Sequence, residues 1–189
     1  FGQPEYSQIP MAVIGIVMKF FQIVISVVVG LSASCTPITG YNIGAGRNDR
    51  VKSLFSLLLM CEAVIGLVAF VIAEVFPAEI AELFGASGES VHYLNFTVKS
   101  FRTYLCLIVL ACINKAAFIF IQAMGRAWTS AGLSSIREVV FGAGLTIILP
   151  MYMGLDGVLW SMPASDALTF IVSVIVIAMI YRELNLSVR

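Results

Sequence analysis

The chain has 189 residues, of which 60% are hydrophobic and 12% are charged, and its 11 basic side chains are balanced by 11 acidic ones. Soluble domains are usually about 45–50% apolar and about 25% charged. The composition therefore excludes a soluble globular domain and is typical of a membrane protein, with the lipid bilayer as its main partner and no nucleic acid.

Five long apolar stretches follow one another and account for most of the chain. A membrane-spanning helix needs about 20 mainly apolar residues, so we interpret each stretch as a span. The sequence thus predicts an all-α membrane protein with five transmembrane helices, at about 11–34, 54–76, 99–123, 131–153 and 156–181.

The segment ahead of the first span, FGQPEYSQIP, is short and polar and begins with Phe1 rather than Met. No basic region precedes the apolar stretch, so a signal peptide is not predicted. We expect instead that the chain begins in a loop between two spans of a longer protein.

The connections between the spans alternate in charge. The first connection, 40–53, is basic, the second, 77–98, is acidic, and the third, 124–130, is basic again. Cytoplasmic loops are enriched in Lys and Arg. We therefore expect the basic connections and the C-terminus in the cytoplasm, and the N-terminal stub, 77–98 and 154–157 outside.

Within the second connection, FPAEIAELFGASGESV places apolar and acidic side chains at helical spacing. Pro77 near the start and Gly85 after the pattern mark the ends of a short helix. We expect an amphipathic helix that lies at the outer membrane surface.

Six charged side chains lie well inside the predicted spans, away from the span ends, and three of them are basic and three acidic. Charges inside a bilayer are costly and usually face a cavity or a partner. At about 1.5 Å per residue, four lie roughly 9–12 Å from the cytoplasmic end of their helix: Glu62, Lys115, Arg137 and Glu138. Lys19 and Asp166 lie roughly 12–15 Å from the outer end, so two polar layers are predicted. Four uncharged side chains extend these layers: Gln22, Ser26, Asn114 and Gln122.

Two interpretations of the inner layer remain open. One is a set of internal salt bridges, in which Lys115 or Arg137 pairs with Glu62 or Glu138, and the other is a substrate cavity. Arg137 and Glu138 are adjacent and point about 100° apart on an α-helix. We therefore do not expect these two to pair with each other.

For Lys19 and Asp166 the cavity interpretation is preferred, because fewer partners are expected at their depth. An acid in such a cavity can carry a proton or hold a cationic substrate. The candidate residues of the substrate or ion cavity are Lys19, Gln22, Asn114, Lys115, Arg137, Glu138 and Asp166.

No catalytic or metal-binding pattern is found in the sequence. GxSxG, HExxH and Walker motifs are absent, so we expect no enzyme activity and no cofactor. No CxxC pair occurs, so neither a metal site nor a disulfide is predicted from the four cysteines, Cys35, Cys61, Cys106 and Cys112.

The end of the first span reads SASCTPITGYNIGAGRNDRV. This stretch resembles the multidrug and toxic compound extrusion (MATE) family, whose second and eighth helices end in a Pro followed by a YNxGAxxxxRV-like run. The matching positions are Pro37, Tyr41, Asn42, Gly44, Ala45, Arg50 and Val51.

A second stretch, QAMGRAWTSAGLSSIREVVFGAGLTIILPMYMGLDGVLWSMPASDAL, looks like the last two helices of the same family. The shared pattern is a Gly with a basic residue, a Ser-x-x-Arg, a Pro, and a Gly-Leu-x-Gly-Val run followed by Pro and Asp. It is matched by Gly125, Arg126, Ser134, Arg137, Pro150, Gly154, Leu155, Gly157, Val158, Pro163 and Asp166.

The resemblance implies a transporter of two six-helix lobes, in which these spans are the eighth through twelfth helices and form most of the second lobe. It implies export of small organic, often cationic, compounds in exchange for H⁺ or Na⁺. The N-terminal lobe of the same protein would be its partner, and the location would be a prokaryotic inner membrane.

Two features refine what the resemblance implies. Some members bind the coupling cation with an acid in the tenth helix, whereas 99–123 has Asn114 and Lys115 but no acid, so no coupling ion is assigned. The motif from Pro37 to Arg50 is expected to shape the helix end, because Pro removes a backbone donor and Gly44 and Gly46 permit a tight turn.

The alternative function is a lipid-linked oligosaccharide flippase of the same superfamily. Such a protein would want a strongly basic cavity, whereas the charges here are balanced. An intramembrane enzyme would need paired catalytic residues at one depth, and Lys115 with Glu138 alone matches no known chemistry. A purely structural subunit would not explain two buried charge layers.

Overall fold

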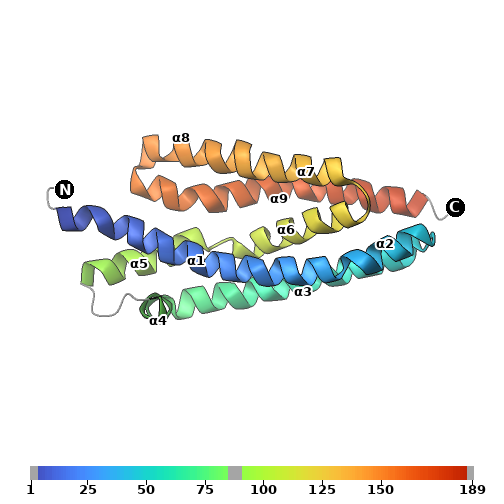
Figure 1. Ribbon diagram of the computed structural model, residues 1–189. Helices are drawn as coiled ribbons and strands as arrows, with labels where there is room; N and C mark the ends of the chain where they lie inside the picture. The colour runs from blue at the N-terminus through green and yellow to red at the C-terminus, as the bar shows by residue number, and fades with distance from the viewer. Residues whose placement is uncertain (1–3, 85–90, 187–189) are drawn as a thin grey trace.

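The computed structural model describes residues 4–84 and 91–186, and every element in these ranges is helical. The long helices run side by side along one axis, back and forth between the two ends of the molecule (Figure 1). This confirms the predicted all-α membrane fold. The elements are α1 (Pro4–Ser34), α2 (Thr36–Gly44), α3 (Asn48–Val75), α4 (Pro77–Leu83), α5 (Val91–Tyr104), α6 (Ile108–Ala123), α7 (Ala127–Ser135), the π-helix η1 (Ile136–Ala143), α8 (Gly144–Met153) and α9 (Leu155–Leu186).

The described residues hold four helical segments that are long and apolar enough to cross a membrane. A fifth crossing results if α5 and α6 are taken as one span, although they are bent by 45° at their junction. The four unbroken segments are Pro10–Gly44, Asn48–Val75, Ala127–Met153 and Leu155–Leu184.

The break between α5 and α6 differs from the single span predicted at 99–123. The chain turns at 105–107, where the amide of Ile108 donates to the carbonyl of Leu105 at 3.0 Å. Neither Pro nor Gly occurs in this turn, so the sequence carries no local signal for it. In addition, α5 begins at Val91, within the segment that was expected to be a connection.

The first span extends further than its apolar stretch. α2 continues the path of α1 as far as Gly44, and only 45–47 separate it from α3, so the loop predicted at 40–53 is mostly helical. Pro37 lies in the first turn of α2, where its missing N–H is not needed for helical bonding. Gly46 has φ +69°, which favours glycine and confirms its role in a tight turn.

The short helix α4 occupies the start of the predicted amphipathic segment. Ile80 is buried against the bundle, whereas Glu79 and Glu82 are exposed. Ile80 and the two acids agree with the predicted amphipathic helix, whereas Leu83 is 83% exposed. The location of the helix at the outer membrane surface stays a prediction. Gly85, which was expected to follow it, lies outside the described residues.

α6 is the central helix and packs against α1, α3, α7 and α9. In Figure 1 it lies between the pair α1–α3 and the pair α7–α9. Its Phe120 stacks on Phe55 of α3 with ring centroids 4.4 Å apart, and Phe55 stacks on Tyr181 of α9 at 5.7 Å. A Cβ on Gly66 of α3 would lie 2.8 Å from the Cα of Val109. Small residues permit such close approach of membrane helices.

The hairpin of α8 and α9 is equally tight. Gly154 connects the two helices at φ +59°. A side chain on Gly157 would collide with the backbone of Leu149 and lie 2.6 Å from the nitrogen of Pro150. α8 has no fully buried residue, and three of its apolar side chains, Ile147, Ile148 and Met151, are exposed.

Candidate functional site

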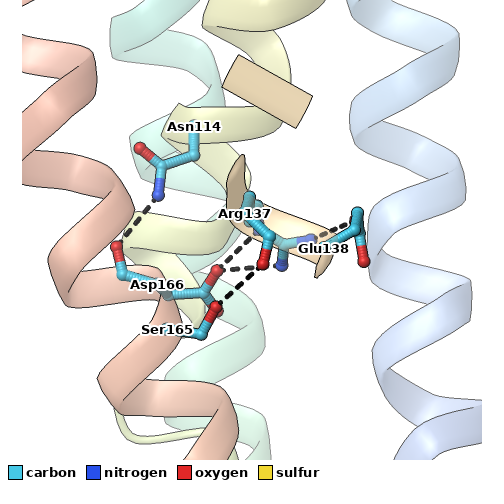
Figure 2. A network of polar contacts seen from close by, with 5 residues as sticks. All are labelled: Asn114, Arg137, Glu138, Ser165 and Asp166. Carbon is cyan, nitrogen blue, oxygen red and sulfur yellow. Dashed lines mark hydrogen bonds and ion pairs between the residues drawn. The ribbon is translucent and has the colours of Figure 1, made fainter. Parts of the chain in front are cut away.

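A buried ion pair between Arg137 and Asp166 joins η1 to α9. Nε of Arg137 donates to Oδ1 of Asp166 at 2.9 Å, and Nη2 lies 2.8 Å from the same oxygen. Both side chains are nearly inaccessible, with 8% and 3% of their surface exposed. Figure 2 shows the guanidinium beside the carboxylate, between the two helices. Contacts of this kind neutralise both charges and fix the orientation of the guanidinium.

The π-helical geometry of η1 positions Arg137. A π-helix bonds each amide to the carbonyl five residues earlier and often occurs at functional sites. Gly142 lies five residues after Arg137, and a Cβ there would be 3.0 Å from the Arg137 carbonyl oxygen. The hydroxyl of Ser165 donates to that same carbonyl at 3.2 Å. Gly142 thus permits the wide turn, and Ser165 ties the turn to α9.

Glu138 also binds Arg137, so the expectation that these neighbours would not pair is wrong. Nη1 of Arg137 lies 2.6 Å from Oε1 of Glu138. The expected angle of 100° assumed an α-helix, whereas the wider π-helix turns less per residue and the Arg side chain is long. Glu138 is 60% exposed and points towards α1 (Figure 2). Arg137 therefore connects a buried acid with an exposed one.

Asn114 on α6 contacts the same turn of α9. Its Nδ2 donates to the backbone carbonyl of Asp166 at 3.1 Å. The residue is fully buried, and its Oδ1 has no hydrogen-bond partner among the described residues. Buried polar atoms without partners are uncommon in folded proteins. The network of Figure 2 therefore joins α6, η1 and α9 and retains one free acceptor.

A pocket of 270 Å³ lies beside this network, between α1 and η1. Its lining is largely apolar with a few polar groups, as in many sites for small molecules. The lining residues are Met18, Phe21, Gln22 and Ile25 from α1, Tyr104 from α5, Lys115 from α6, Arg137 and Glu138 from η1, and Met162 from α9.

The structure brings most of the predicted cavity residues together. Lys19 is the exception, because its side chain is exposed and does not line the pocket. The others either line the pocket or belong to the network beside it: Gln22, Lys115, Arg137 and Glu138 in the lining, and Asn114 and Asp166 in the network.

The predicted separation of Asp166 and Arg137 into two polar layers is wrong. Arg137 lies 16 residues before Met153, the end of α8, and Asp166 lies 11 residues after Leu155, the start of α9. At about 1.5 Å per residue their depths differ by only about 7 Å, which the Arg side chain spans. Asp166 thus has a buried partner, and the cavity role preferred for it is not supported.

The apolar part of the lining was missed. Met18, Phe21 and Ile25 share a face of α1 with Gln22, and their helical spacing is visible in the sequence. Tyr104 reaches the pocket at the end of α5, where the chain bends. No local sequence signal marks that bend, so Tyr104 could not have been found in this way.

The residues of the first family motif shape one end of the bundle. Asn42 is buried, and its side-chain Nδ2 donates to the backbone carbonyl of Ile38 at 2.8 Å. The backbone carbonyl of Asn42 accepts from the backbone amide of Arg47 at 2.8 Å. The bond from Arg47 closes the turn between α2 and α3. Other members of the motif are exposed at the same end: Pro37, Tyr41, Gly44, Ala45 and Arg50.

The second family motif begins in the α6–α7 connection and runs through α7, η1 and α8 into α9. Pro150 falls inside α8, Pro163 is buried inside α9, and Gly157 forms their close contact. This motif therefore holds α8 against α9, and the buried Asp166 follows Pro163 within the same helix.

The family is decided by comparison with known proteins. The family model MatE matches residues 4–149, which is more than half of the chain. The chain belongs to the MatE family. This family consists of membrane transporters, so the chain is an integral membrane protein.

Curated relatives of this MatE chain are multidrug export proteins of staphylococci. It is 23% identical over 186 residues to the multidrug export protein MepA of Staphylococcus aureus (strain MSSA476). It is also 23% identical over 185 residues to MepA of Staphylococcus haemolyticus (strain JCSC1435). These matches cover 97% and 96% of this chain but 40% and 39% of the relatives. The chain thus spans about two fifths of their length.

Solved MATE structures share the fold. A MATE in complex with MaL6 matches with a TM-score of 0.84 and 21% identity, covering 92% of this chain and 39% of that one. An inward-facing MATE family transporter matches with a TM-score of 0.81 and 20% identity. The match covers 89% of this chain and 39% of the transporter. The MATE multidrug transporter DinF-BH matches with a TM-score of 0.80 and 26% identity. The match covers 94% of this chain and 38% of that transporter. The fold of this MatE chain is therefore that of part of a MATE transporter.

Proposed function

We propose that this MatE chain forms most of the C-terminal lobe of a secondary active antiporter, which exports organic, often cationic, compounds in exchange for H⁺ or Na⁺. The observation that carries the proposal is the pocket between α1 and η1 in a chain of this family. The staphylococcal relatives, which are named as multidrug export proteins, support the same class of substrate.

The charges around the pocket are balanced, since Lys115 and Arg137 are matched by Glu138 and the neighbouring Asp166. Arg137 is held by Asp166, so its charge is largely neutralised within the network. Glu138 exposes a carboxylate on the pocket wall, where it can attract a cationic group. The methionine and aromatic side chains of the lining provide adaptable apolar contacts, which suit substrates of varied shape.

The proposed location is the plasma membrane of a prokaryote, with the C-terminus in the cytoplasm. The turns at 45–47 and 124–126 and the end of α9 lie at one end of the bundle (Figure 1). Arg47, Arg126 and Arg182 gather at that end, and Lys and Arg are enriched on the cytoplasmic side. The partner that completes the substrate path is the other lobe of the same transporter.

A drug-susceptibility assay tests the proposal. Cells that lack their own efflux pumps would express the full-length transporter as wild type, Glu138→Gln or Lys115→Ala. We expect the wild type to raise tolerance of cationic dyes several-fold and both pocket variants to lose most of this gain. Glu79→Gln is the matched control, because Glu79 is an exposed acid on α4, outside the pocket lining.

Membrane insertion of each variant would be checked by immunoblot. A well-inserted wild type that gives no tolerance would contradict export of drugs, and translocation of lipid-linked oligosaccharides would then be measured. Pocket variants as active as Glu79→Gln would remove the pocket from the substrate path.

A further inference from the structure

A second buried acid, Glu62 on α3, lies outside the network of Figure 2. Its exposed fraction is 0%, and its Oε1 accepts a hydrogen bond from the hydroxyl of Ser32 on α1 at 3.0 Å. Its Oε2 has no hydrogen-bond partner, and no Lys or Arg in 4–84 or 91–186 forms an ion pair with it. Glu62 therefore differs from Asp166, which is held by Arg137.

Glu62 lies at the midpoint of α3, 14 residues after Asn48 and 13 before Val75. At about 1.5 Å per residue it is about 20 Å from either end of the helix. The sequence predicted a span that begins at 54, which placed Glu62 nearer the cytoplasmic end. In the structure α3 begins six residues earlier, at Asn48, so Glu62 is central. A charge at this depth is costly unless it has a partner.

The helices packed on this part of α3 bring few titratable or charged groups. α6 brings Cys112, whose Sγ would lie 3.3 Å from a Cβ on Gly66, one turn along α3 from Glu62. Lys115, almost one turn further along α6, lines the pocket beside α1. Cys35, which lies between α1 and α2, follows three residues after the Ser32 that bonds Glu62. None of these groups supplies a positive charge to the carboxyl.

Other charged or titratable groups meet α3 away from Glu62. Arg102 of α5 pairs with Glu74 at 3.3 Å, near the end of α3. The hydroxyl of Tyr181 of α9 lies 2.7 Å from that of Ser56, about two turns before Glu62. α2 carries no charged residue.

The surroundings of Glu62 suit a proton better than a metal cation. Hard cations need several oxygen ligands. The hydroxyl of Ser32 is the side-chain oxygen bonded to Glu62, whereas α6 brings the thiol of Cys112 and the close backbone contact of Val109 with Gly66. A proton requires no further ligand and removes the charge outright.

We propose that Glu62 is a proton-binding site, neutral while α1, α3 and α6 are packed together, and that it releases its proton to water when these helices separate. On release the O–H bond breaks, the proton passes to a water molecule, and the remaining carboxylate is hydrated. In the packed arrangement Glu62 is 0% exposed, so its carboxyl is shielded from bulk water. The proton site rests on the packing of this chain alone, and its part in transport rests on the function proposed above.

Infrared spectroscopy of the full-length protein in lipid nanodiscs tests this proposal directly. A protonated carboxylic acid has a carbonyl-stretching band that a carboxylate lacks. At neutral pH we expect this band in the wild type, its loss in Glu62→Gln, and its retention in the matched control Glu79→Gln. A band of equal size in wild type and folded Glu62→Gln would overturn the assignment. Loss of the wild-type band on adding Na⁺ at constant pH would overturn it in favour of a metal cation.

Ser32→Ala provides a second test that keeps the acid, in case Glu62→Gln does not fold. Removing the hydroxyl should shift the frequency of the band, because Ser32 donates to Glu62. An unshifted band, or its absence, would overturn the proposal. Neither spectrum depends on transport, so failure of the susceptibility assay and failure of the proton site are distinguishable.

Discussion

At the scale of single residues, Arg137 connects the buried interface between η1 and α9 with the wall of the pocket. It contacts the buried Asp166 and the exposed Glu138 at the same time. Arg137→Met would leave Asp166 charged and buried without its partner, which costs about 3–5 kcal/mol in soluble proteins. Glu138→Gln removes only an exposed contact, worth about 0–1 kcal/mol. We expect a large fall in melting temperature for Arg137→Met and a small one for Glu138→Gln.

Thermal unfolding of the detergent-purified protein, followed by tryptophan fluorescence, would measure both variants. Equal shifts would show that the burial of Asp166 does not decide the stability of this network. Lys115→Ala is a useful reference, because Lys115 forms no ion pair within the described parts of the chain.

The sequence predicted which residues gather at the site better than how they pair. Gln22, Lys115 and Glu138 were found because polar side chains in an apolar span need a cavity or a partner. The contacts of Arg137 were not found, because they depend on the π-helical turn and on the offset between η1 and α9. Both features are set by tertiary packing, and residue spacing on a regular α-helix does not predict them.

At the scale of helices, the glycines of the last hairpin have different roles. Gly157→Ala would force a Cβ into the backbone of Leu149, so α8 must move away from α9. Gly144 is also helical, but nothing lies within 4 Å of the place a Cβ would take. Gly144→Ala should therefore be neutral or stabilising by up to about 1 kcal/mol, whereas Gly157→Ala should lower stability clearly.

Melting temperatures of the two variants would be compared in the same detergent. A neutral Gly157→Ala would mean that α8 and α9 can separate without loss, contrary to the close contact described.

Helix positions were predictable where apolar residues run on, and helix ends were not. The stretch 54–76 lies almost wholly within α3, yet α3 begins at Asn48, because polar residues such as Asp49 and Lys52 extend the helix into the interface. Likewise, the helical part of α5 before Lys99 carries polar side chains that a hydropathy criterion rejects. Hydropathy marks only the apolar part of a helix, whereas the backbone hydrogen bonds of the helix continue into the polar residues on either side.

At the scale of the whole molecule, the proposed orientation can be tested by labelling. Asp49→Cys would lie at the start of α3 and Glu79→Cys on α4, and both positions are exposed. In a background without native cysteines, a membrane-impermeant maleimide should label Glu79→Cys in intact cells and Asp49→Cys only after permeabilisation. The reverse pattern would place the basic turns outside and contradict the proposed cytoplasmic C-terminus.

The short connections described above limit how this bundle can deform. The α2–α3 and α6–α7 connections consist of 45–47 and 124–126, and Gly154 alone separates α8 from α9. Three residues reach at most about 10 Å when fully extended, so these helices have almost no slack and one cannot slide far past the next. The bend at 105–107, where α5 meets α6, is then a point at which α6 can swing away from α1 and α3. The bend beside Tyr104 would thus act as a hinge within this lobe, and the pocket lies next to it.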